Sequence, residues 1–306
     1  MNMFFYKYHG LGNDYLVYDT QKNSVKLNKE SVCLICNRNF GLGSDGILEG
    51  PLFENGGIGL RIYNPDGSIA EKSGNGVRIF SKFLKDAGYV KEKSFVLHTL
   101  GGDVTVTYNN DNGTNITVSM GQLHFTKKAV GSINTPEEMV NIPLDFNHKI
   151  YQCTCVSIGN PHCVIPMDEV SKELVCEIGK YSEIAEYFPN RINTQIVKVL
   201  DKNNIQVEIY ERGAGYTLAS GSSSCAAAGA IYRLGLVEPD VTVHMPGGEL
   251  KIHIDSEFNV KMTGNVCSVG RMELSDEFIT ENGIDVKDGF TENSPASGRQ
   301  SISCIS

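Results

Sequence analysis

Two short segments of this chain each combine a serine, a glycine and a following apolar helix pattern. Ser73-Gly74-Asn75-Gly76 precedes one pattern and Ser220-Gly221-Ser222-Ser223 precedes the other. Apolar residues recur at helical spacing after each serine and a glycine ends each run, which predicts two helices buried along one face. A helix N-terminus presents unpaired backbone N–H groups and the positive end of the helix dipole. Two such ends side by side would bind a small anion such as a carboxylate.

The bulk composition limits the classes of protein to consider. The chain has 306 residues, 41% hydrophobic and 21% charged, which allows one or two folded domains. A net charge of −9 and the lack of long basic runs argue against nucleic-acid binding. No apolar run approaches the length of a membrane span, and the first residues lack a signal-peptide layout. We therefore expect a cytoplasmic protein with no nucleic-acid or membrane partner.

The nine cysteines indicate neither a disulfide framework nor a metal site. Their odd number and scattered spacing suit a reduced compartment. Cys33 and Cys36 form a CxxC without a second pair, so we interpret both as small core residues. Cys153 and Cys155 alternate in a strand-like run and receive the same interpretation. We expect no metal, and no phosphate-binding or dinucleotide motif indicates a cofactor.

The chain repeats one order of elements in its two halves. Alternating apolar residues predict strands before and after each Ser-led helix, so each helix should lie inside a wrap of strands. Residues 275–306 lose apolar periodicity and predict a polar, flexible tail that folding does not need. The expected organisation is an N-terminal domain over 1–125, a connection over 126–149, a C-terminal domain over 150–274 and the tail.

Eight short motifs identify a family. They occupy residues 9–14, 41–46, 64–68, 74–78, 159–162, 191–194, 211–215 and 245–248. In this order they resemble the motifs of diaminopimelate epimerase, a cofactor-independent amino-acid racemase of lysine and cell-wall biosynthesis. The resemblance covers nearly the whole chain before the polar tail.

The resemblance implies an α+β fold of two similar domains related by a pseudo-twofold axis, with the site in the cleft between them. It implies an isomerase with a two-base mechanism, in which one cysteine thiolate removes the α-proton and a cysteine thiol on the other face returns one. Two helix N-termini hold the α-carboxylate and stabilise the charge that develops on deprotonation. It also implies a homodimer and a small amino-acid substrate.

The chain departs from the family at both proton-transfer positions, where Ser73 and Ser220 replace cysteine. A thiol has a pKa of about 8.5, which a helix N-terminus lowers further. A serine hydroxyl is a weak base until a neighbour activates it, so this form should be weak or inactive by the cysteine mechanism. Engineered replacement and natural divergence both explain the two serines. Tyr216, where the family usually has Glu, favours divergence.

At most of its other site positions, this chain has the same residues as the family. The resemblance implies that ten residues bind substrate: Asn13, Asn64, Gly74, Asn75, Asn160, Asn193, Glu211, Arg212, Gly221 and Ser222. A bidentate contact from Arg212 would hold a distal carboxylate, and Glu211 could take an ammonium group. Asn and Gly in such turns can also serve only to shape the backbone.

Three further residues have roles that the sequence leaves open, and two other functions remain as alternatives. Tyr216 and Ser44 are candidates for substrate specificity, and His162 suits a structural role as well as a contact role. One alternative is a racemase of another amino acid, such as a basic one. The other is a binding relic that holds an amino acid without turning it over.

Overall fold

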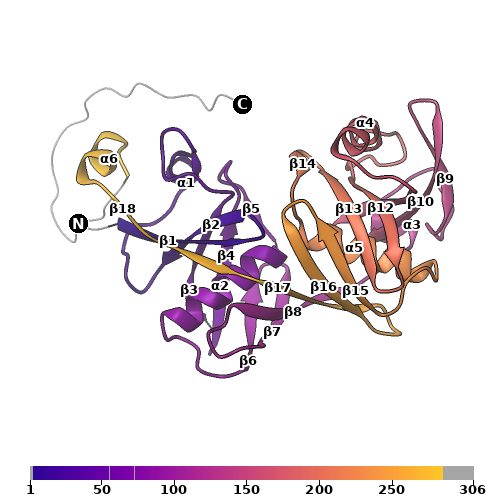
Figure 1. Ribbon diagram of the computed structural model, residues 1–306. Helices are drawn as coiled ribbons and strands as arrows, with labels where there is room; N and C mark the ends of the chain where they lie inside the picture. Colours follow the sequence, from indigo (N-terminus) through magenta and orange to yellow (C-terminus); the bar gives the residue numbers. More distant parts are fainter. Residues whose placement is uncertain (1–2, 55, 72, 285–306) are drawn as a thin grey trace.

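The computed structural model describes residues 3–54, 56–71 and 73–284 of the chain. Two lobes lie side by side, and each contains one long helix enclosed by strands (Figure 1). The helix of the N-terminal lobe is α2 (Gly74–Asp86), and that of the C-terminal lobe is α5 (Gly221–Arg233). This arrangement confirms the predicted α+β fold of two similar domains, each with strands around a central helix.

The N-terminal lobe contains strands on both sides of α2 in the sequence. They are β1 (Met3–Gly10), β2 (Asn13–Asp19), β3 (Ile47–Glu54), β4 (Gly57–Tyr63), β5 (Ile69–Ala70), β6 (Ser94–Thr99), β7 (Gly102–Tyr108) and β8 (Asn115–Gln122). Along β8, buried residues alternate with more exposed ones, because one face of the strand covers the core. Helix α1 (Lys29–Cys36) packs outside the strands; Cys36 is buried and Cys33 is half-buried.

The C-terminal lobe repeats this plan around α5. Its strands are β9 (Ile142–Phe146), β10 (Lys149–Ser157), β11 (Pro161–Pro166), β12 (Asn193–Asp201), β13 (Asn204–Glu211), β14 (Gly215–Thr217), β15 (Asp240–Met245), β16 (Gly248–Ile254) and β17 (Asn259–Asn265). Helix α4 (Lys172–Ser182) covers the outer face. The expected connection over 126–149 contains α3 (Lys127–Val130) and β9, and β9 pairs with β10, so this segment adds to the C-terminal lobe.

Two strand pairings join the lobes. β8 pairs antiparallel with β17, so the last strand of the first wrap borders the second. After β17 the chain returns to the N-terminal lobe as β18 (Cys267–Leu274), which pairs antiparallel with β1. The expected C-terminal domain over 150–274 therefore gives its last strand to the other lobe (Figure 1).

The segment after β18 differs from the expected flexible tail. Ser275 caps a short helix, α6 (Asp276–Glu281). Ile279 and Ile284 are each 6% exposed and join the apolar cluster that contains Met3 and Phe5. The prediction of a flexible tail is wrong for residues 275–284, because two isoleucines anchor them on the N-terminal lobe. Residues 285–306 lie outside the described part of the chain.

A shared apolar core surrounds both central helices. One continuous apolar cluster includes Phe80 of α2, Ala227 of α5 and residues from the strands of both lobes. The small residues of α5 allow close packing: a Cβ added at Gly229 would lie 2.1 Å from Leu123 Cδ1. No helix in the described ranges is long and apolar enough to cross a membrane.

Candidate active site at two helix N-termini

Helices α2 and α5 begin beside one another, and each begins after a serine. Ser73 Oγ accepts a hydrogen bond from Gly76 N at 3.0 Å, and Ser220 Oγ accepts one from Ser223 N at 3.4 Å. A Cβ added at Gly221 would lie 3.6 Å from Gly74 Cα, so the first turns of the two helices are in contact. The structure thus brings together the two serines' helices, as the sequence predicts, and both positive dipole ends meet.

Glycine at the first position of each helix makes this approach feasible. A Cβ at Gly74 would lie 2.6 Å from Met262 Cε, and one at Gly221 would lie 3.1 Å from the same atom. Met262 of β17 is fully buried and packs beneath both helix starts. A larger residue at either position would push Met262 aside or separate the helices, so both glycines have a packing role.

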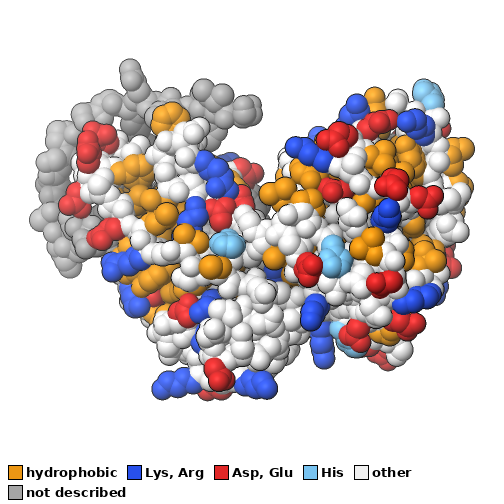
Figure 2. All heavy atoms as spheres, viewed as in Figure 1, with side chains coloured by type: hydrophobic (Ala, Val, Ile, Leu, Met, Phe, Trp, Pro, Cys, Tyr) orange, Lys and Arg blue, Asp and Glu red, His pale blue; other side chains and the backbone are white. Residues whose placement is uncertain are grey.

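The surface is hollowed between the two lobes, on the side where β5 and β14 lie (Figures 1 and 2). These two short strands stand on opposite sides of the notch, and each leads within a few residues to Ser73 or Ser220. The notch is therefore the expected route by which a small ligand reaches the helix starts.

A chain of polar side chains orders the N-terminal side of the site. Arg78 Nη2 donates to Asn75 Oδ1 at 2.6 Å, and Asn75 Nδ2 donates to Asn13 Oδ1 at 3.0 Å. Asn13 Nδ2 in turn donates to Asp45 Oδ2 at 2.8 Å. Each amide orientation is fixed by the next partner, so two of the predicted ligand residues, Asn13 and Asn75, are held together beside the start of α2.

Arg78 places a buried positive charge behind this helix start. Its side chain is fully buried, and burial lowers the pKa of its guanidinium to about 10. Within the described ranges no carboxylate forms an ion pair with Arg78, and its Nε has no hydrogen-bond partner. A buried charge without a counter-ion attracts an anion more strongly than an exposed one. Arg78 therefore adds to the attraction of the helix starts for a carboxylate.

On the C-terminal side, the turn before β11 orders a second set of polar groups. Asn160 Nδ2 donates to Ser222 Oγ at 3.4 Å, in the first turn of α5. Asn160 Oδ1 lies 3.0 Å from His162 Nε2. The two predicted ligand residues Asn160 and Ser222 are thus brought together, and the contact with His162 fixes the orientation of the asparagine.

The distal residues form a third group. Arg212 N donates to Asn193 Oδ1 at 3.0 Å, and Arg212 Nη1 donates to Asn190 O at 3.0 Å. Glu211 Oε2 accepts from Thr217 Oγ1 at 3.1 Å. The Arg212 side chain is exposed, so its guanidinium is accessible to a ligand carboxylate.

Three predicted residues have local structural contacts instead. Tyr216 donates to Glu208 at 2.9 Å and its ring lies under the Lys172 ammonium of α4, so it points to the α4 side of β14. Ser44 is buried and donates to Gly46 O at 2.9 Å. Asn64 donates to Ser68 Oγ and closes its own turn. These contacts favour structural roles for all three side chains.

Tyr15 is a residue that no motif in the sequence singles out, and it contacts the first serine. The Tyr15 hydroxyl lies 3.2 Å from Ser73 Oγ. Burial raises the pKa of Tyr15 to about 12, and the carboxylates of Asp45 and Glu211 act in the same direction, while the hydrogen bond with Ser73 opposes them. Glu211 belongs to the other lobe, so residues of both halves act on this hydroxyl. In the sequence, Tyr15 lies within an apolar strand pattern and resembles a core residue.

Neither serine has a conventional activating group. In residues 3–54, 56–71 and 73–284, no His, Lys or carboxylate lies within hydrogen-bond distance of Ser73 Oγ or Ser220 Oγ. The described ranges also contain no group of three His, Cys, Asp or Glu residues that could hold a metal ion. The chemistry that these residues support is anion binding with weak proton transfer.

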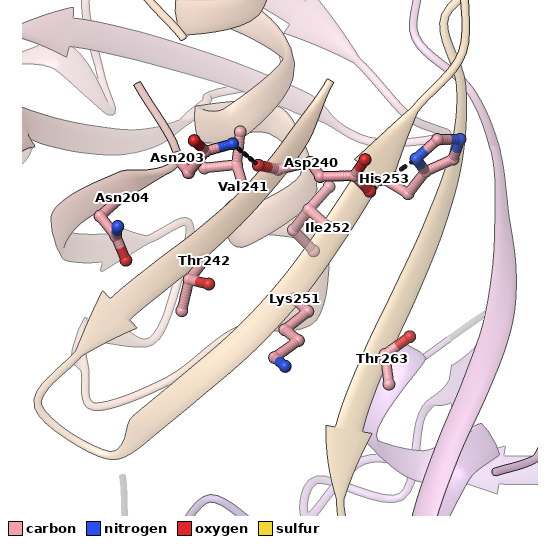
Figure 3. Close-up of a pocket in the computed structure, with 9 residues that line it drawn as sticks. All are labelled: Asn203, Asn204, Asp240, Val241, Thr242, Lys251, Ile252, His253 and Thr263. Atoms are coloured by element: carbon pink, nitrogen blue, oxygen red, sulfur yellow. Dashed lines mark hydrogen bonds and ion pairs between the residues drawn. The ribbon is translucent and has the colours of Figure 1, made fainter. Parts of the chain in front are cut away.

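A separate hollow lies on the outer face of β15, β16 and β17 (Figure 3). It encloses about 410 Å³ and is lined by Asn204, Lys251 and Thr263, among others. An exposed hydrogen bond between Asp240 and His253 lies at one side. None of the residues at the helix starts reaches it, so it is not part of this site.

His162 makes the fold sensitive to acid. It is fully buried, and burial lowers the pKa of its imidazole to about 3. Between this value and the usual value of about 6.5, the unfolded chain binds more protons than the folded chain. The contribution to stability is therefore complete above about pH 6.5. It is lost as the pH falls toward 3, by roughly 3 to 6 kcal/mol in total.

We expect His162→Gln to flatten this dependence. The free energy of unfolding, measured by urea titration between pH 4 and 7, should fall less steeply with acid than in the parent. His124→Gln is the matched control, because His124 is exposed. An unchanged slope in the His162 variant would show that another group causes the acid sensitivity.

The comparisons with known proteins agree with this geometry. Diaminopimelate epimerase is the family whose sequence model matches, over residues 5–126 and 154–269. Diaminopimelate epimerase 2 of Nostoc sp. (strain PCC 7120) is 47% identical over 93% of this chain and 100% of its own length. Diaminopimelate epimerase of Synechocystis sp. (strain PCC 6803) is 37% identical over 86% of this chain and 96% of its own length.

Solved structures of lower sequence identity share the fold. The hydroxyproline epimerase of Agrobacterium vitis has a TM-score of 0.63 at 12% identity, over 89% of this chain and 92% of its own. A PhzF-family phenazine biosynthesis protein of Bacillus anthracis has a TM-score of 0.61 at 16% identity, over 90% of this chain and 99% of its own. With the family match over most of its length, the chain belongs to the diaminopimelate epimerase family of isomerases.

Proposed function

We propose that this chain binds a small amino acid with its α-carboxylate at the starts of α2 and α5, and inverts the α-carbon between Ser73 and Ser220. The contact of the two helix starts, each preceded by a serine, is the observation that carries the proposal. The backbone N–H groups of two helix starts and the positive ends of their dipoles suit a carboxylate, and they stabilise it further when it gains charge. No cofactor is needed for this role.

The proton balance explains why this form should be slow. On one face the α C–H bond breaks, its proton passes to a base, and the electron pair spreads into the carboxylate. On the other face a hydroxyl or thiol delivers a proton to carbon. A neutral serine can deliver a proton, but it must first lose its own proton before it can accept one. A pair of thiols can both accept and deliver a proton near neutral pH, whereas a pair of hydroxyls cannot.

The distal groups favour a substrate with a second charged end. Arg212 offers a guanidinium to a carboxylate, and Glu211 offers a carboxylate to an ammonium. Diaminopimelate carries both groups at its far end, and the names of the relatives support it as the first candidate. A basic amino acid would use Glu211 but leave Arg212 unpaired, so we rank it second.

Replacing Arg212 with Ala should weaken diaminopimelate binding about tenfold to a hundredfold, because a hydrogen bond between charged groups contributes about 1.5 to 3 kcal/mol. Isothermal titration with diaminopimelate measures the dissociation constant. Arg233→Ala is the matched control, since Arg233 is exposed at the end of α5 and pairs with Glu138. Equal affinity of the Arg212 variant and the parent would remove Arg212 from the site.

A protein that only binds an amino acid would differ from an isomerase in one measurable property, the exchange of the α-proton. A panel of amino acids incubated with the protein in deuterated water should lose the α-proton NMR signal if the chain is an isomerase. Thermal stabilisation by the same amino acids without any loss of signal would support the relic. We also propose a role in lysine biosynthesis, a cytoplasmic location and a homodimer, on the basis of the sequence and the family.

A further inference from the structure

We propose that Tyr15 is a positioning residue that donates a hydrogen bond to the side chain at position 73 and makes this position the base of the pair. The inference rests on the proposed function in assigning position 73 to proton transfer. The motif that contains Asn13 ends before Tyr15, so nothing in the sequence pattern assigns it a role.

The backbone and its neighbours fix the tyrosine ring. Tyr15 lies in β2 opposite Tyr8 of β1, and it is 7% exposed. A Cβ added at Gly46 would lie 2.8 Å from Tyr15 Cε1, so the ring fills the space that this glycine leaves. The φ of Gly46 is 153°, a conformation that residues with side chains rarely adopt. The hydroxyl is therefore held 3.2 Å from Ser73 Oγ with little freedom to move.

The direction of the hydrogen bond follows from the groups around it. Either hydroxyl could donate on geometry alone. Tyr15 keeps its proton, because burial and the carboxylates of Asp45 and Glu211 oppose its ionisation. Ser73 Oγ is already an acceptor for Gly76 N–H. Once the group at position 73 has lost its proton it can only accept, so Tyr15, which keeps its proton, is then the donor.

The two serines then differ in how well they tolerate negative charge. Position 73 has two donors, Gly76 N at 3.0 Å and Tyr15 Oη at 3.2 Å. Position 220 has Ser223 N at 3.4 Å. Hydrogen bonds to the charged form of a group favour that form, so an anion is more stable at position 73. In the resting protein the group at 220 should therefore be protonated and act as the donor, and the two roles exchange in the reverse reaction.

The test measures the proton affinity of a thiol at position 73, which needs no isomerase activity. Ser73→Cys is prepared alone and together with Tyr15→Phe, and the rate of iodoacetamide alkylation at position 73 is followed against pH by peptide mass spectrometry. We expect the thiol to titrate about one pH unit lower when Tyr15 is present than in the Tyr15→Phe background. Tyr108→Phe in the Ser73→Cys background is the control, because Tyr108 donates to Ser81 O elsewhere in the same lobe.

Identical alkylation profiles with and without the Tyr15→Phe replacement would overturn the proposal. If the Tyr15→Phe protein does not fold, 3-fluorotyrosine at position 15 takes its place in the test. A stronger phenol donor should lower the pH of half-maximal alkylation further, and an unchanged or higher value contradicts the proposal. A shifted profile in a protein that exchanges no α-proton would support the Tyr15 contact while rejecting the proposed function, so the two failures can be told apart.

Discussion

Replacing Ser73 and Ser220 together with cysteine should raise α-proton exchange of diaminopimelate by at least about a hundredfold, the usual contribution of a positioned acid or base. Both residues cap helices whose first turns touch, so both thiols would lie beside a positive dipole end. This setting lowers the pKa of a thiol and provides the thiolate that inversion requires.

The measurement is the loss of the α-proton NMR signal in deuterated water. Each single replacement should gain much less, because inversion needs an acceptor on one face and a donor on the other. Isothermal titration of the double variant checks that diaminopimelate still binds. Binding without exchange in the double variant would show that the site has been redirected to another ligand or another reaction.

Local signals in the sequence were sufficient for the two central helices. Each begins at a serine whose hydroxyl caps it, and each carries apolar residues at helical spacing on the buried face. The capping residue and the periodicity are properties of neighbouring residues, so they are visible without knowledge of the fold. Their contact at Gly74 and Gly221 came only with the resemblance to a family.

Strands β3 and β18 have no clear alternating pattern in the sequence and depend on distant partners. β3 contains Gly50 and Pro51, which interrupt its alternation. β18 is exposed over most of its length, and its pairing with β1, near the other end of the chain, is what makes it a strand. The glycine and proline of β3 and the exposed residues of β18 both argue against a strand when only neighbouring residues are considered.

The site likewise contains residues that short motifs identify and residues whose roles depend on contacts between distant parts of the chain. Asn13 and Asn75 were found because they stand in motifs, and the hydrogen bond between them confirms their proximity. Tyr15 stands outside the motifs, and its contact with Ser73 joins distant parts of the chain. Arg78 stands in the motif over 74–78, but its complete burial is a property of the fold that the motif does not reveal. Tyr216 departs from the family pattern, yet its hydroxyl donates to Glu208 of the neighbouring strand β13. These contacts favour a structural role for Tyr216 over a role in substrate choice.

Ending the chain after Leu274 should destabilise the protein by about 3 to 6 kcal/mol, since it removes two isoleucines whose burial contributes about 1.5 to 3 kcal/mol each. Ile279 and Ile284 are each 6% exposed in the cluster that also holds Met3 and Phe5. This cluster secures β1, which pairs with both β2 and β18. The truncation should therefore lower the stability of the whole N-terminal lobe.

Thermal unfolding followed by circular dichroism measures the effect, and a fall in Tm of roughly 5 to 9 °C is expected. A chain that ends at Ile284 is the matched control, because it keeps α6 and removes only residues whose sequence lacks apolar periodicity. Ile279→Asp in the full chain should reproduce most of the loss, because it places a charge among the same apolar side chains. If the chain that ends at Leu274 and the chain that ends at Ile284 unfold at the same temperature, α6 contributes nothing to stability. The tail would then be dispensable, as its sequence predicts.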